Sequence, residues 1–296
     1  MWIVVTLVAA AFQTARTALQ HRLRKLLSVG GAGFVRYAYG APISLSSVAV
    51  MALAGVSLPQ IPVRFWPTVA AAGVAQIVAT NLLIRAFDTR SFSLGTVYAK
   101  TEVAQVAVFS WVLLGEPVNG LAWIAIAVCL VGVVKLAVPA GAQARTLLFG
   151  AGDRAALFGI AAGGGFGLAA VGIRAAANSL TGADAVPRAL VTLAVMNTIQ
   201  TIVHGTYLAV NDRPQIGLAF KHWRSSAVVG VLSVCGSAGW AIAMTLQNAA
   251  RVRTLGQVEL LFTFAIAAFV LKEKHTRNEI TASGLIALGV IGVMLV

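Results

Sequence analysis

Two glutamates in apolar sequence are the residues of this chain best suited to chemistry, Glu102 and Glu259. An ionisable side chain inside a bilayer costs about 2.5–3.5 kcal/mol on insertion scales, so it usually faces a polar cavity or a charged partner. A carboxylate held in such a place can bind a proton and a cationic substrate alternately, as coupled transport requires. The alternative is a structural ion pair with a nearby Lys or Arg.

These glutamates belong to a repeated pattern. Glu102 and Glu259 are 157 residues apart (259 − 102), and Glu116 and Glu273 have the same separation (273 − 116). The same offset relates three further pairs: Trp66 and Trp223, Gly73 and Gly230, Gly132 and Gly289. The offset therefore indicates an internal repeat, in which two copies of one unit follow each other. Internal duplication is typical of many transporter folds.

Polar residues near Glu102 form a candidate binding stripe. Tyr98 and Gln105, at i−4 and i+3, should share its helix face, whereas Lys100 and Thr101 should point elsewhere. Such a stripe could bind a zwitterionic or hydrogen-bonding solute. A satisfied network between helices is the alternative.

The first apolar segment carries Gln13, Arg16 and Gln20 at helical spacing. A polar face toward lipid is implausible, so we expect this face to meet a cavity or a neighbouring helix.

Further candidates lie in other apolar segments. Asn197, Gln200 and His204 repeat the i, i+3, i+7 spacing. Arg36 could neutralise a substrate carboxylate or pair with a glutamate, and snorkelling to the interface is the alternative. Trp240 could form an aromatic wall for a ligand, with lipid or core packing as the alternative.

Composition indicates a membrane protein. Of the 296 residues, 59% are hydrophobic and 10% are charged, whereas soluble domains carry roughly 25% charged residues. A span needs about 20 apolar residues to cross the hydrocarbon core. Ten such spans fit, at about 2–20, 33–55, 66–86, 91–114, 118–138, 153–174, 187–210, 223–247, 253–271 and 278–296.

Five spans per half is an odd number, so the second copy should enter the membrane from the opposite side as an inverted repeat. We predict an all-α integral membrane protein, with a first five-helix repeat over residues 1–138 and a second over 153–296. A linker, PAGAQARTLLFGAG, occupies 139–152.

The basic residues of the chain indicate orientation. Arg24, Lys25 and Lys272 lie in odd-numbered loops, which by the positive-inside rule should be cytoplasmic, with both termini outside. Arg251 and Arg253, expected in the eighth loop, argue the other way. The net charge of +13 is explained by anchoring to headgroups, and we expect no nucleic-acid partner.

Residues 91–136 resemble the drug/metabolite transporter superfamily, specifically its EamA family. This segment has a small-residue start, an apolar helix, the turn LLGEP and a final glycine-bearing helix, and residues 252–296 repeat the layout with LKEKH in place of LLGEP. The resemblance implies ten helices around a central cavity, with no cofactor.

The function expected on this basis is secondary transport, with export of a small polar metabolite such as an amino acid by alternating access. One alternative is an importer or exchanger of a nucleoside-like or cofactor-like solute. Another is an integral-membrane enzyme or a structural subunit, although no nucleophile, metal or Walker-type motif points to an enzyme. We expect a multi-pass protein of the cytoplasmic (inner) membrane, with the small-molecule substrate, the lipid bilayer and protons as partners, and we expect a monomer to suffice.

Overall fold

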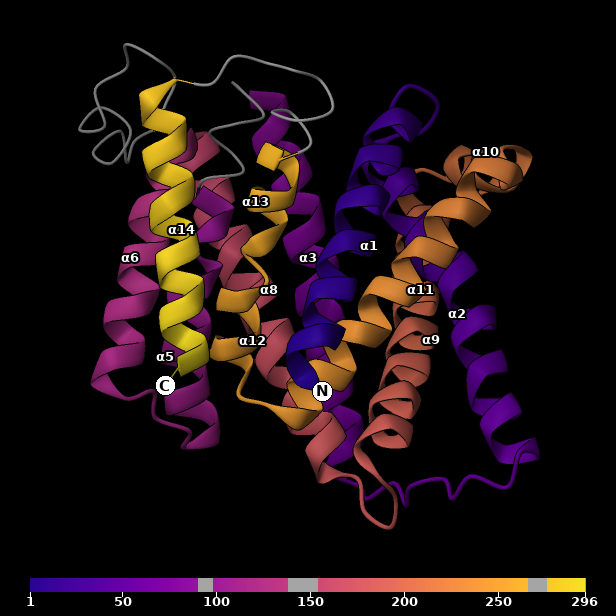
Figure 1. The fold of residues 1–296 in the computed structure, drawn as a ribbon. Coiled ribbons are helices and arrows are strands. Elements are labelled where there is room, and N and C mark those ends of the chain that lie inside the picture. Colours follow the sequence, from indigo (N-terminus) through magenta and orange to yellow (C-terminus); the bar gives the residue numbers. More distant parts are fainter. Residues whose placement is uncertain (90–97, 138–153, 266–275, 296) are drawn as a thin grey trace. The chain divides into compact units, whose positions relative to one another are not determined.

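The structure, a computed structural model, describes residues 1–89, 98–137, 154–265 and 276–295, and this part of the chain is helical (Figure 1). An isolated bridge joins Gln60 to Thr181. The helices, in chain order, are α1 (Trp2–Leu23), α2 (Val29–Leu53), α3 (Phe65–Thr89), α5 (Glu102–Leu114), α6 (Gly120–Ala137), α8 (Arg154–Ser179), α9 (Ala185–Asn211), α10 (Pro214–Lys221), α11 (Trp223–Leu246), α12 (Ala249–Leu255), α13 (Val258–Ala265) and α14 (Arg277–Leu295).

The helices form two compact units. Unit 1 comprises Met1–Ile77 with Ala169–Asn248, and unit 2 comprises Val78–Leu168 with Ala249–Val296. Each unit therefore takes helices from both halves of the chain. Two of the three boundaries fall inside α3 and α8, so these helices contribute residues to both units, and the third falls between α11 and α12.

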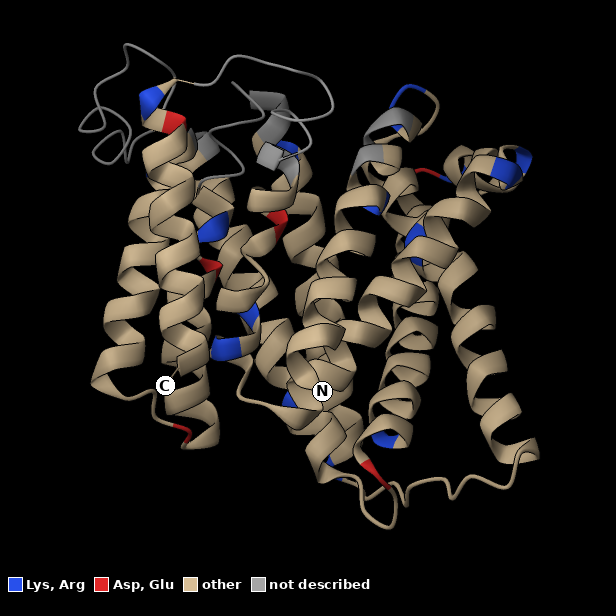
Figure 2. Cartoon of the chain, viewed as in Figure 1, with Lys and Arg blue, Asp and Glu red and all other residues tan. Residues whose placement is uncertain are grey.

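Five helices in the described part of the chain are long and apolar enough to cross a membrane: Phe65–Ala86, Ala156–Ser179, Ala185–Asn211, Trp223–Leu246 and Arg277–Leu295. Charged residues are sparse along the described helices (Figure 2). The expectation of apolar membrane helices is confirmed to this extent, and crossing by the other expected spans stays a prediction.

The observed helices differ from the expected spans in three places. The ninth span, expected as one helix over 253–271, is divided in its described part into α12 and α13. The fourth span is interrupted at Thr101, and its first residues lie outside the described part. The short helix α10 was not expected, because eight residues are too few to give a span-length apolar signal.

In unit 2, α6 and α14 pack side by side through a matched pair of glycines (Figure 1). A Cβ added at Gly132 would lie 2.7 Å from the backbone nitrogen of Ile286, and one added at Gly289 would lie 2.6 Å from that of Cys129. Gly289 is equivalent to Gly132 and Ile286 is equivalent to Cys129, each at the offset of 157 (289 − 132 and 286 − 129). The contact is therefore reciprocal, because each helix places its glycine against the equivalent residue of the other helix. Small residues allow this close backbone approach.

Unit 1 contains a second reciprocal contact. Gly73 of α3 lies against Met196 of α9, and Gly230 of α11 lies against Tyr39 of α2. The offset of 157 again relates the two glycines (230 − 73) and the two larger residues (196 − 39). The repeat detected in the sequence is therefore a repeat of contacts as well as of residue types.

The equivalent helices α2 and α9 run antiparallel in unit 1. Gly30 lies against Leu208, and further along α2 Gly40 lies against Asn197. Gly40 and Asn197 are themselves equivalent (197 − 40 = 157), so equivalent residues meet at this point.

We expect Gly132→Ala and Gly289→Ala to destabilise the protein by similar amounts, about 1–3 kcal/mol each, because an added methyl group would collide with the backbone of the facing helix. Thermal unfolding of the purified protein in detergent would measure the loss.

Gly284→Ala is the matched control on α14, because a Cβ at Gly284 meets nothing within 4 Å. It should leave the melting temperature unchanged or raise it slightly. Wild-type stability of Gly132→Ala would contradict the close approach of α6 and α14.

Candidate functional site

Both candidate glutamates follow a break in a helix. Glu102 is the first residue of α5, directly after the turn at Thr101, and Glu259 is the second residue of α13, after the turn at Gly256 and Gln257. A carboxylate in the first turn of a helix is favoured by the unpaired N–H groups and by the helix dipole. The two breaks therefore give the equivalent glutamates equivalent local surroundings.

The glutamates form ion pairs across the two halves of the chain, inside unit 2. Lys100 pairs with Glu259, and Arg253 Nε lies 2.9 Å from Glu102 Oε1. The four side chains are only 11–15% exposed. The cluster has two positive and two negative charges, so it is neutral as a whole, as a buried ionic group must be.

These pairs change two expectations from the sequence. Lys100 was expected off the helix face that carries Glu102, with no partner named, and it pairs with Glu259. Arg253 was expected in a loop, but it lies in α12 and pairs with Glu102. The ion pairs named as the alternative for both glutamates are therefore present.

Gln105 stabilises the break before Glu102. Its Nε2 donates to Thr101 Oγ1 at 2.9 Å and to the carbonyl of Ile160 in α8 at 3.2 Å. The expected face shared by Tyr98, Glu102 and Gln105 is therefore divided, because Tyr98 precedes the break. Gln105 and Glu102 remain on one helix, and Tyr98 contributes its main-chain carbonyl to the turn, which accepts from Thr101 Oγ1 at 2.6 Å.

Gly163, in the glycine-rich stretch 163–167 of α8, packs against the break at Thr101. A Cβ at Gly163 would lie 2.8 Å from the carbonyl oxygen of Ala99 and 3.1 Å from the backbone nitrogen of Glu102. A larger residue would displace the turn that positions the carboxylate. The glycines therefore serve close helix packing at the site.

The polar face of α1 meets neighbouring helices in unit 1. Gln13 Oε1 accepts a hydrogen bond from Trp240 Nε1 at 3.0 Å, and Gln20 Nε2 donates to the carbonyl of Ala32 at 2.8 Å. Arg16 Nη2 lies 3.5 Å from Thr17 Oγ1 on its own helix. These contacts fit the part of the expectation that placed this face against a neighbour.

Polar residues of α9 join it to α2 and α3. Asn197 Nδ2 donates to Ser44 Oγ at 3.3 Å. Gln200, fully buried, donates from Nε2 to the carbonyl of Gly73 at 3.1 Å and to Gln76 Oε1 at 2.9 Å. Within unit 1 these two residues are parts of an interhelical network.

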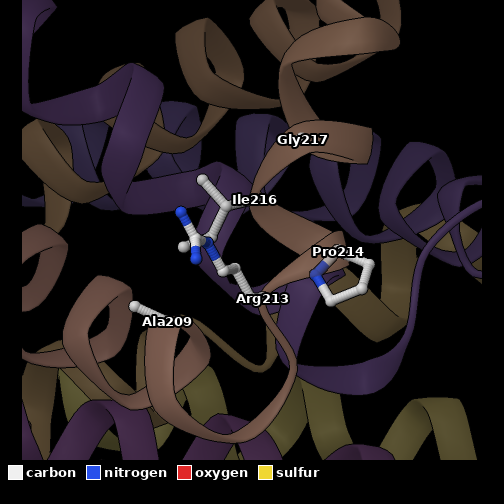
Figure 3. Close-up of a pocket in the computed structure, with 5 residues that line it drawn as sticks. All are labelled: Ala209, Arg213, Pro214, Ile216 and Gly217. Carbon is white, nitrogen blue, oxygen red and sulfur yellow. The ribbon is translucent and has the colours of Figure 1, made fainter.

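A surface pocket lies at the turn between α9 and α10 (Figure 3). Its lining residues are Ala209, Arg213, Pro214, Ile216 and Gly217. None of the residues predicted for the site contributes to it. Its largely apolar lining offers a single charged group, so we do not assign the transport site to it.

Comparisons with known proteins give a family and a fold. The model of the EamA-like transporter family matches residues 1–138 and 154–295. No curated protein matches the chain. One solved structure, described only as a crystal structure of a protein, is 13% identical, with a TM-score of 0.74 over 99% of this chain and 96% of that chain. At this identity the likeness is one of fold.

We expect Lys100→Met to destabilise the protein by about 3–5 kcal/mol, because it removes the cation that pairs with the buried Glu259 carboxylate. The double variant Lys100→Met/Glu259→Gln should recover most of this loss, since both charges are removed together. Thermal unfolding in detergent would measure both.

Lys221→Met, at an exposed lysine of α10, is the control and should change stability by no more than about 0.5 kcal/mol. If the double variant were as unstable as Lys100→Met, the pairing would not be what stabilises this region.

Proposed function

The chain belongs to the EamA-like transporter family, whose model matches both of its halves, and on this premise we propose that it is a secondary active transporter that exports a small polar metabolite, such as an amino acid or a related compound, by alternating access. The observation that carries the proposal is the pair of equivalent glutamates at helix breaks, each bound to a cation from the other half of the chain.

The proposed architecture is ten spans in two inverted five-helix repeats around a central cavity. The antiparallel packing of equivalent helices supports it, because α2 faces α9 and α6 faces α14 through contacts that repeat at an offset of 157. In inverted-repeat transporters, alternating access is largely a rocking of one bundle against the other around a fixed site.

The proposed coupling step is an exchange of partners at the glutamates. A proton or a cationic group that binds Glu259 replaces Lys100 as its counter-ion, and the contact between the two broken helices then weakens. Glu102 and Arg253 are the equivalent pair, so the same exchange is available in both halves. Discontinuous helices are suited to this role, because their free main-chain groups can contact a substrate.

The proposed setting is the inner membrane, with the chain acting as a monomer. Both termini lie on the outer side in this proposal. Assigning Arg253 to a buried ion pair supports that orientation, since it removes one of the two basic residues that argued for the opposite one.

Counterflow in proteoliposomes tests the proposal. Vesicles loaded with unlabelled amino acids, nucleosides or amines are mixed with a labelled tracer, and uptake above that of empty vesicles shows transport. We expect Glu259→Gln to lower uptake about tenfold or more, the change that corresponds to losing an interaction of at least 1.4 kcal/mol. Glu116→Gln makes the same chemical change in the turn after α5 and should leave uptake unchanged.

A charge-swapped variant separates coupling from structure. Lys100→Glu/Glu259→Lys keeps one charge of each sign in this ion pair and should keep the protein folded, but it moves the carboxylate off α13, so we expect counterflow to stay low. Wild-type counterflow by this variant would show that Glu259 acts only as half of an ion pair. Absence of uptake of every tracer by folded wild-type protein would count against the transport proposal.

A further inference from the structure

Arg36 is a buried cation that has no hydrogen-bond or ion-pair partner in the described part of the chain. It lies in α2 and is only 6% exposed. It makes neither a hydrogen bond nor an ion pair with any described residue, and its Nε is buried without an acceptor.

Unit 1 has no carboxylate near enough to neutralise Arg36. Its sequence contains two acidic residues, Asp184 and Asp212, at the N-cap and the C-cap of α9. Arg36 lies one turn from Gly40, which contacts Asn197 on α9. At 1.5 Å per residue, Asp184 is about 20 Å along α9 from Asn197, and Asp212 is about 22 Å away in the other direction.

Unused hydrogen-bonding groups lie beside Arg36. Its guanidinium carbon is 5.4 Å from the ring centroid of Tyr37, whose ring is 6.0 Å from that of His204 on α9. The Tyr37 hydroxyl and both His204 ring nitrogens are buried and have no hydrogen-bond partner among the described residues. Buried polar groups are usually paired, so this concentration of unpaired groups points to a missing ligand.

The groups together offer a guanidinium, a phenolic O–H and an imidazole N–H, which suit an oxyanion. We infer that Arg36, Tyr37 and His204 form a binding site for the anionic group, carboxylate or phosphate, of a small solute. Phe34 and Tyr207 pack on His204, with centroids 6.1 and 6.3 Å from its ring, and give the site apolar walls. The inference rests on the proposed function in one respect, namely that this solute is the transported substrate.

Thermal unfolding of the purified protein tests the site without transport. Acetate and inorganic phosphate are titrated separately, with potassium chloride holding the ionic strength constant. We expect one of the two anions to raise the melting temperature of the wild type, and its identity decides between a carboxylate and a phosphate site. Tyr37→Phe should weaken the response, and Arg36→Met should require about tenfold more anion or abolish the response.

The stability of Arg36→Met without added anion gives a second, independent readout. Because the charge is unneutralised, its removal should leave the melting temperature unchanged or raise it. Arg174→Met is the matched control, since Arg174 Nη1 donates to the carbonyls of Met244 and Gln247 at 2.6 and 2.7 Å. This control should lower the melting temperature and keep the anion response.

Three results would overturn the inference: no response of the wild type to either anion, a full response in Arg36→Met, or a loss of stability in Arg36→Met equal to that of Arg174→Met. Counterflow distinguishes this failure from failure of the proposed function. Transport of amine tracers that is equal in wild type and Arg36→Met refutes the anion site for transport and leaves the transporter standing. An anion response that depends on Arg36, without uptake of any tracer, supports the site and counts against the transporter.

Discussion

The need to neutralise charge inside apolar helices governs the arrangement of unit 2. Lys100, Glu102, Arg253 and Glu259 are each mostly buried, and each would be strongly unfavourable alone. Two ion pairs, each joining a residue of the first half to one of the second, neutralise all four charges. These pairs can form only if α12 and α13 lie beside the break that precedes α5. Both helix breaks and the close packing of Gly163 of α8 lie at this cluster.

The second constraint is the close approach of equivalent helices. Gly132 and Gly289 each face a backbone nitrogen of the opposite helix, so α6 and α14 are in contact with no side chain between them at these points. Lipid does not drive helices together as water does, and dense packing of this kind takes over that role. Because the contact is reciprocal, each half supplies both a glycine and the surface that receives one.

The sequence predicted the helical class and most helix positions, because apolar length and the offset of 157 are properties of the residues themselves. It did not predict the two helix breaks, since the residues on either side are apolar and continue the span pattern. Thr101, a frequent residue type at helix starts, and Gly256 were the available signals. The partners of the glutamates depend on contacts between the two halves, which spacing along one helix cannot give.

The crossed ion pairs also determine the order in which the protein can be assembled. Lys100 and Glu259 are separated by 159 residues, so during synthesis the first half enters the membrane before its charges can meet their partners. Glu102 likewise cannot pair until Arg253, in the second half, has been synthesised. Both compact units require helices from each half, so neither can be completed from the first half alone. Unit 2 can therefore be completed only late in synthesis, and until Arg253 and Glu259 have been made, Lys100 and Glu102 lack these partners.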